Sequence, residues 1–159
     1  MLKIRPLHFV DIIRDIGNDI IEFKPYANGN NYHVVAAQIL NNKDLLLEIT
    51  LDPDDVCRPC RNNAGGACDE SIDRSFRPTA PPLMRDWDLL VNRRWCDRLK
   101  INPGDRFTAK ALCRILENHT DNMQEIYREI IDDRIAKKEI AVKKGVAKYS
   151  GTEGMRNKA

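Results

Sequence analysis

The sequence predicts one α+β domain that is predominantly helical, with a short strand or hairpin leading into a cysteine-rich loop. Apolar residues recur every three or four positions through much of the chain, as on one face of an amphipathic helix. Residues 45–51 form a short apolar run with β-branched residues near its end, which is typical of a strand. Three cysteines follow within residues 57–68, among Pro, Gly and charged residues that favour neither helix nor strand.

Composition limits the size of the domain and the classes of partner. A chain of 159 residues can form a single domain that buries roughly two-thirds of its unfolded surface without disulfides. The net charge is only +2 and aromatic residues make up 6%, so the composition does not favour a nucleic acid partner. Apolar runs are far shorter than a membrane span of roughly 20 residues, and the charged N-terminal segment has no small-residue cleavage site of a signal peptide. We therefore expect a cytoplasmic protein with no membrane partner.

The first half of the chain alternates between helical patterns and loops. Isoleucines at spacings of three and four predict helix within residues 2–22, interrupted near Gly17. Asn31 is placed to cap a further helix that runs to about residue 40. The predicted strand at residues 45–51 then leads directly into the cysteine loop, residues 52–70.

Three helices are predicted in the second half, near residues 83–100, 109–117 and 121–148. Thr108 is placed as the N-cap of the second of these helices, and Asp121 as the N-cap of the third. The first has an apolar residue at every fourth position, namely Leu83, Trp87, Val91 and Trp95. Small and polar residues 150–159 are expected to form a disordered tail, which leaves the domain at residues 1–149.

The three cysteines have the pattern C-x2-C-x7-C, at Cys57, Cys60 and Cys68. Buried cysteines often act as small hydrophobic residues, but the polar neighbours of these three give them no apolar core to join. A redox dithiol is less favoured, because no helix-forming sequence begins after Cys60 to lower the pKa of a thiol. Thiolates clustered on one loop are the ligands that zinc and iron–sulfur clusters prefer, so the pattern predicts a metal site.

Three segments of the chain also resemble a family of small bacterial and archaeal proteins, domain of unknown function twelve eighty-four. Residues 5–11 (Arg-Pro-Leu-His-Phe-Val-Asp) are similar to the opening R-P-H-H-L-L-C motif of the family. Residues 54–60 are similar to its D-D-I-C-x-x-C motif, and residues 66–68 to its G-x-C motif. With a further likeness at residues 99–108, the resemblance covers about residues 3–117. It implies an iron–sulfur cluster, because the family is thought to bind one.

The fourth ligand of this site is not given by the resemblance, because the family has Cys where this chain has Asp11. Cys96 is the preferred replacement, since it lies about a right angle from Trp95 around its helix, at or beyond the edge of the apolar stripe. Asp11 is the next choice, through its carboxylate. Cys113 is least favoured because its helix face predicts a core position, and His8 is expected to support the ligands rather than bind the metal.

The ligand set alone does not decide between zinc and a cluster, but the cysteine pattern together with the resemblance favours a 4Fe–4S cluster. Zinc sites usually combine two C-x-x-C or Cys/His pairs, whereas this chain has one such pair and isolated cysteines. Iron–sulfur sites more often combine one pair with scattered cysteines. The predicted function is therefore an uncharacterised iron–sulfur protein, with electron transfer to a redox partner near the loop as one role.

Two other functions remain open from the sequence. One is a structural zinc module that acts as a protein-interaction platform through the basic helix from Arg134 onward. The other is an enzyme with a three-cysteine cluster and an open iron beside Asp11 or His8. The sequence contains no catalytic constellation that would identify the reaction of such an enzyme.

Overall fold

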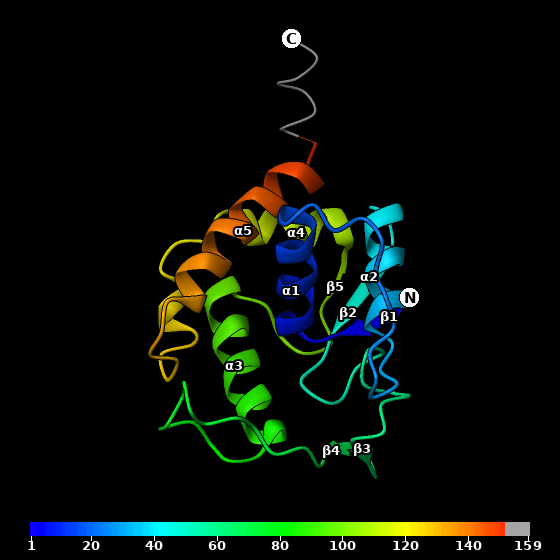
Figure 1. The fold of residues 1–159 in the computed structure, drawn as a ribbon. Helices are drawn as coiled ribbons and strands as arrows, with labels where there is room; N and C mark the ends of the chain where they lie inside the picture. Colours follow the sequence, from blue (N-terminus) through cyan, green and yellow to red (C-terminus); the bar gives the residue numbers. More distant parts are fainter. Residues whose placement is uncertain (152–159) are drawn as a thin grey trace.

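The computed structural model describes residues 1–151 and has the predicted α+β architecture with a helical majority. Figure 1 shows α1 at the centre of the molecule, with α3 and α5 on one side and α2 with the three-stranded sheet on the other. In chain order the elements are β1 (Leu2–Ile4), α1 (Pro6–Gly17), α2 (Tyr32–Asn41), β2 (Leu46–Ile49), β3 (Asn63–Ala64), β4 (Ala67–Cys68), α3 (Met84–Leu99), β5 (Arg106–Thr108), α4 (Ala109–Glu117), the 3₁₀ turn η1 (Met123–Glu125) and α5 (Arg134–Tyr149).

The larger sheet has the strand order β1-β2-β5, with β1 parallel and β5 antiparallel to the central strand. On one face, Lys3, Glu48 and Arg106 are opposite one another, and Glu48 forms ion pairs with both basic side chains. Alternation along the strands places the apolar residues on the other face, where Ile4, Leu47 and Ile49 are buried. The sheet is therefore one-sided, with its buried face directed to the core.

The strand β1 corrects the sequence prediction, which gives only interrupted helix over residues 2–22. Its three residues pair with Leu47, Glu48 and Ile49, a partner strand that local periodicity cannot identify. Pro6 then starts α1 at its first position, where a missing backbone N–H has no cost. The helix ends at Gly17, as the sequence predicts.

Two glycines allow α1 and α5 to pack with their backbones in contact. A Cβ added to Gly17 would lie 1.8 Å from the carbonyl oxygen of Ala141, and one added to Gly145 would lie 1.8 Å from that of Ile13. Both distances are far below any van der Waals contact, so only glycine fits at these two positions. This close approach fixes how α5 crosses the central helix (Figure 1).

The predicted helix over residues 121–148 is wrong in its first half. The chain forms the short η1 turn and then an irregular segment, and regular helix begins only at Arg134. Side chains donate hydrogen bonds to backbone carbonyl groups of this segment. Arg94 donates to the oxygen of Ile126 at 3.0 Å, and Gln124 donates to that of Ile130 at 2.6 Å. The apolar residues of the segment are nevertheless buried, namely Met123, Ile126, Tyr127 and Ile130.

The other two helices of the second half are confirmed as α3 and α4. Thr108 is the expected N-cap of α4, because its hydroxyl oxygen accepts a hydrogen bond of 3.1 Å from the backbone N–H of Ala111. Most of the predicted tail, residues 152–159, lies outside the described residues. Within residues 1–151, no helix has both the length and the apolar character that a membrane crossing requires.

The glycine contact between α1 and α5 gives a direct test of the fold. Gly145→Ala is expected to lower the free energy of unfolding by about 3 kcal/mol, because the new methyl group meets the backbone of Ile13. Alanine has a better helix propensity than glycine, but this stabilises the helix by only about 1 kcal/mol and does not offset the clash. Denaturant unfolding measures the effect, with exposed Lys144→Ala in the same helix as the control. Equal or greater stability of Gly145→Ala would contradict the close packing.

Candidate metal centre

The cysteine loop is built from a tight turn followed by a two-stranded hairpin. The backbone N–H of Cys60 donates to the carbonyl oxygen of Cys57, and the N–H of Asn63 donates to that of Cys60. Next, β3 pairs with β4 so that Asn63 is opposite Cys68. The two residues between these strands, Gly65 and Gly66, have φ values of +60° and +86°, which suit a tight hairpin turn. The hairpin thereby returns the third cysteine to the first two.

Cys57, Cys60 and Cys68 line one small cavity, with a volume of about 20 Å³. Arg5, Pro53 and Asn63 complete its wall. All three thiols are free and partly buried, as expected for cysteines in a loop near the surface. The structure therefore brings together the three cysteines that the sequence pattern singled out.

Asp54 connects this loop to the start of α1. Its Oδ2 accepts hydrogen bonds from the backbone N–H of Arg5 at 2.8 Å and from Nδ1 of His8 at 2.7 Å. Its Oδ1 accepts from the backbone N–H groups of Val56 and Cys57, at 3.1 and 3.2 Å. This carboxylate is buried, and with four donors around it, it is committed to holding the two segments together.

The same contact places His8 beside Cys57, next to the cavity but outside its lining. Among the described residues, the one set of three metal-binding side chains with ligand atoms within 4.8 Å of one another is His8, Asp54 and Cys57. Burial alone would lower the pKa of His8, but the Asp54 carboxylate outweighs burial and raises it. The carboxylate therefore favours a protonated imidazole, and a metal ion bound there would have to displace that proton.

Arg5 supplies a second fixed charge at the cavity. Its guanidinium is buried and donates to the carbonyl oxygen of Asp52 at 2.9 Å, to that of Leu51 at 3.3 Å and to Oδ2 of Asp88 at 3.3 Å. These contacts hold the side chain in one position on the cavity wall. The sequence analysis missed this role, because the Asp88 partner lies 83 positions further along the chain.

The thiols of Cys57 and Cys68 are not activated by their surroundings. Burial, followed by the nearby Asp54 carboxylate, raises the pKa of Cys57 to about 12. Burial also raises the pKa of Cys68. Both thiols are therefore protonated at neutral pH unless a cation is bound, which does not suit a nucleophile or a redox dithiol. A metal ion reverses this balance, because it deprotonates the thiols that coordinate it.

The structure does not bring Cys96 to the cavity. The loop meets α3 near its first turn, where the N–H of Met84 donates to the oxygen of Glu70. Cys96 lies twelve residues further along this helix, which corresponds to about 18 Å. It is also buried in the hydrophobic core rather than outside the apolar stripe, which corrects the expectation from helical spacing. Cys113 is a core residue, as the sequence predicts.

Asp11 is occupied by other partners. Its carboxylate forms ion pairs with Lys138 of α5 and with Arg14, one turn further along α1. Burial opposes ionisation, but Lys138 and then Arg14 outweigh it and lower the pKa of Asp11. Asp11 therefore joins α1 to α5, and it does not line the cysteine cavity.

Comparisons with known proteins gave no match to a family model, to a curated protein or to a solved structure. The resemblance to domain of unknown function twelve eighty-four rests on the residues of the chain alone, so it stays a prediction.

The Asp11–Lys138 pair predicts a pH-dependent loss of stability. Asp11→Asn should lower the free energy of unfolding by about 2 kcal/mol at pH 7, because it leaves a buried ammonium group without its carboxylate. The pKa of Asp11 is lowered in the folded state, so its contribution is present above about pH 4 and is lost as the pH falls through the folded value. Chemical unfolding at several pH values measures the difference in free energy of unfolding between the unmodified protein and Asp11→Asn. If this difference grew toward low pH, the Asp11–Lys138 ion pair would not be the source of the lost stability.

Proposed function

We propose that the protein holds a metal centre, with an iron–sulfur cluster as the favoured occupant, in the cavity lined by Cys57, Cys60 and Cys68. The observation that carries the proposal is the convergence of these three thiols on one cavity with Arg5 in its wall. The buried guanidinium of Arg5 would partly offset the negative charge of the coordinating thiolates next to it. The resemblance in the sequence points to the same occupant.

We assign the fourth ligand to His8 in place of Cys96. A histidine that binds a metal through one nitrogen usually donates its other N–H to a carboxylate, which fixes the ring and its tautomer. The hydrogen bond from Nδ1 of His8 to Asp54 has this form and leaves Nε2 for the metal. Asp54 itself is not assigned as a ligand, because four donors already use its oxygens.

Two observations bear on the choice between a cluster and zinc. The three sulfurs do not all lie within 4.8 Å of one another, whereas thiolates on one tetrahedral zinc ion would be about 3.8 Å apart. This spacing favours a cluster, in which different iron atoms take the thiolates. The volume of about 20 Å³ instead favours a single ion, because it admits about one water-sized group. Zinc is therefore kept as the second candidate, and a cluster requires the loop to open on binding.

The position of the loop suits electron transfer with a protein partner. When bound, an iron–sulfur cluster would supply single-electron chemistry at a site whose thiols are only partly buried. A redox partner could then dock against the hairpin and the turn before it. We place the protein in the cytoplasm, where a reducing environment keeps its five cysteines free.

Metal content of single variants tests the ligand set. Cys57→Ala, Cys60→Ala, Cys68→Ala and His8→Ala are each expected to lower metal affinity by at least about tenfold, because each removes a coordinating atom. Iron and zinc bound per chain are measured after purification without oxygen, with circular dichroism to check folding. Asp54→Asn is expected to weaken binding by about tenfold through the orientation of His8.

Cys96→Ala and Cys113→Ala are the matched controls, since they remove thiols that are buried in the core. Both should retain the metal of the unmodified protein. Loss of metal in folded Cys96→Ala, with retention in His8→Ala, would restore Cys96 as the fourth ligand. Retention of metal in folded Cys57→Ala would contradict the proposed centre.

A further inference from the structure

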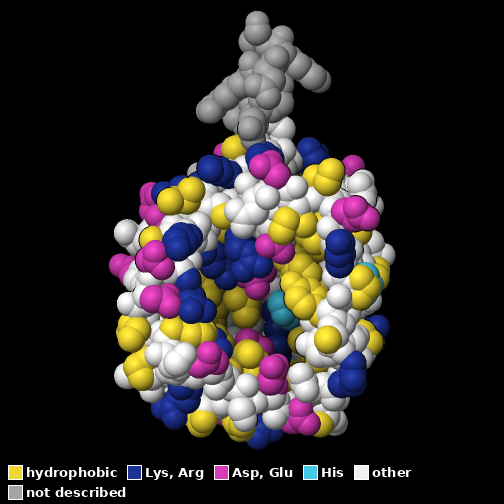
Figure 2. Space-filling view, viewed as in Figure 1, with side chains coloured by type: hydrophobic (Ala, Val, Ile, Leu, Met, Phe, Trp, Pro, Cys, Tyr) yellow, Lys and Arg dark blue, Asp and Glu magenta, His cyan; other side chains and the backbone are white. Residues whose placement is uncertain are grey.

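A larger cleft lies between α1, α3 and α5, beside the segment that precedes α3, and has a volume of about 680 Å³. Figure 2 shows this face hollowed near its centre, with Lys and Arg side chains gathered along one side and hydrophobic side chains within. The cleft falls within the range of roughly 300–1,000 Å³ that small-molecule sites occupy. Its apolar lining includes Leu7, Met84, Trp87 and Ile130.

Arg77 is held at this cleft in a fixed orientation. Its guanidinium carbon lies 4.7 Å from the ring centre of Phe76 and 5.1 Å from that of Trp87. Nε donates a hydrogen bond of 2.8 Å to the carbonyl oxygen of Asp73. The aromatic contacts and this hydrogen bond restrict the side chain, while its two Nη groups have no hydrogen-bond partner within residues 1–151.

The other charged side chains of the cleft are already paired. Asp11 and Asp88, its two acidic residues, form ion pairs with Lys138 and Arg5. The remaining cations have carboxylate partners as well, in the pairs Arg14–Asp15, Arg134–Asp132 and Lys137–Asp133. In the described part of the chain, Arg77 is thus the cation of this cleft that lacks a carboxylate.

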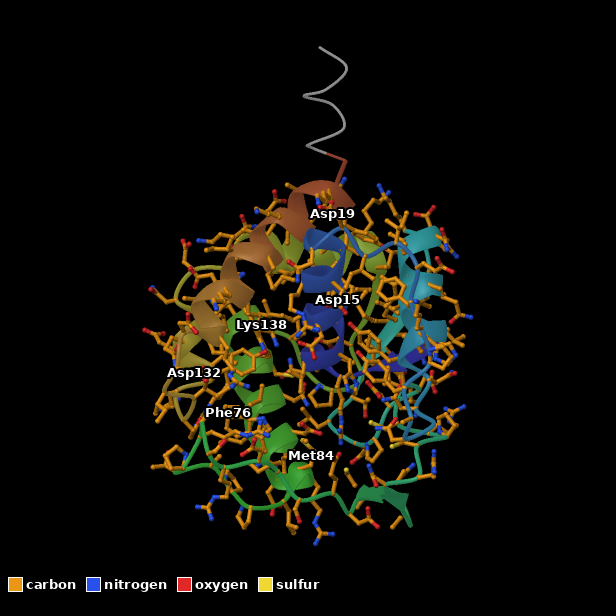
Figure 3. All side chains as sticks on the ribbon, in the orientation of Figure 1. Asp15, Asp19, Phe76, Met84, Asp132 and Lys138 are labelled. Atoms are coloured by element: carbon orange, nitrogen blue, oxygen red, sulfur yellow. The ribbon has the colours of Figure 1, made fainter. Side chains whose placement is uncertain are left out.

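We propose that the cleft binds a small organic carboxylate, with its anionic group on Arg77 and its apolar body against Trp87 and Ile130. A guanidinium with two free Nη groups matches a carboxylate in a two-point hydrogen-bonded contact. The aromatic and aliphatic side chains next to it would bury the apolar part of the same molecule. Figure 3 shows two residues at the edges of this cleft, Phe76 in the segment before α3 and Lys138 on α5.

The charges around Arg77 act on its pKa in both directions. Burial lowers the pKa of Arg77; the carboxylate of Asp73 opposes this shift, Arg134 acts in the same direction as burial, and Asp88 and Glu70 oppose it more weakly. Arg134 also stacks on Phe76, with its guanidinium carbon 3.3 Å from the ring centre. A bound carboxylate would relieve the repulsion between these two guanidinium groups. The proposal does not depend on the metal centre, because none of the cleft residues is one of its ligands.

Phenylacetate and its neutral amide, phenylacetamide, test the charge requirement on the full chain. Two-dimensional NMR titration is expected to show saturable shifts at the indole N–H of Trp87, with a Kd of about 1 mM for phenylacetate. Phenylacetamide should bind at least about tenfold more weakly, since it lacks the charge that Arg77 recognises. Arg77→Gln should weaken phenylacetate binding by a similar factor, while exposed Arg93→Gln in α3 should leave it unchanged.

The comparison of acid and amide uses the unmodified protein, so it stands even if Arg77→Gln disturbs folding. Equal binding of the acid and the amide would overturn the role of Arg77. Absence of saturable shifts with phenylacetate at about 10 mM would overturn the site itself.

Discussion

The buried carboxylate of Asp54 is the contact on which the rest of the site depends. It accepts hydrogen bonds from Arg5 and His8 on one side and from Val56 and Cys57 on the other. The first turn of α1 and the start of the cysteine loop are therefore fixed to each other, although they are far apart in the sequence. Positive charge on His8 and the backbone N–H groups together lower the pKa of Asp54 despite its burial. The hydrogen bond to this carboxylate is the contact that places His8 beside Cys57.

The helix α1 supports both of the sites that we propose. Its first turn carries His8 beside Cys57, and its next turn carries Asp11, which is paired with Lys138 at the larger cleft. Its end packs on α5 through Gly17 and Gly145, which fixes the wall on which Lys138 lies. The Arg5–Asp88 ion pair separates the two sites, because Arg5 lines the cavity while Asp88 lines the cleft.

Local signals in the sequence predicted part of this structure. Thr108 and the apolar pattern behind it identified α4, and the polar setting of Cys57, Cys60 and Cys68 identified the loop that lines the cavity. Features that depend on distant partners were not predictable. Neither the Asp54–His8 contact nor the Arg5–Asp88 pair leaves a periodic pattern, and Asp11 gave no sign of its pairing with Lys138. Cys96 was misplaced because helical spacing defines an apolar face only when one side of the helix is covered, whereas α3 also buries Asp88 and Asn92.

Metal and sulfide analysis of protein purified without oxygen measures whether Cys57, Cys60 and Cys68 hold a metal centre. We predict about four iron atoms and four acid-labile sulfides per chain, with the broad visible absorption of an iron–sulfur cluster. One zinc ion per chain without colour would keep the centre and change its occupant. Protein that contains no iron, sulfide or zinc, and that takes up neither metal after reconstitution, would show that these three cysteines hold no metal centre.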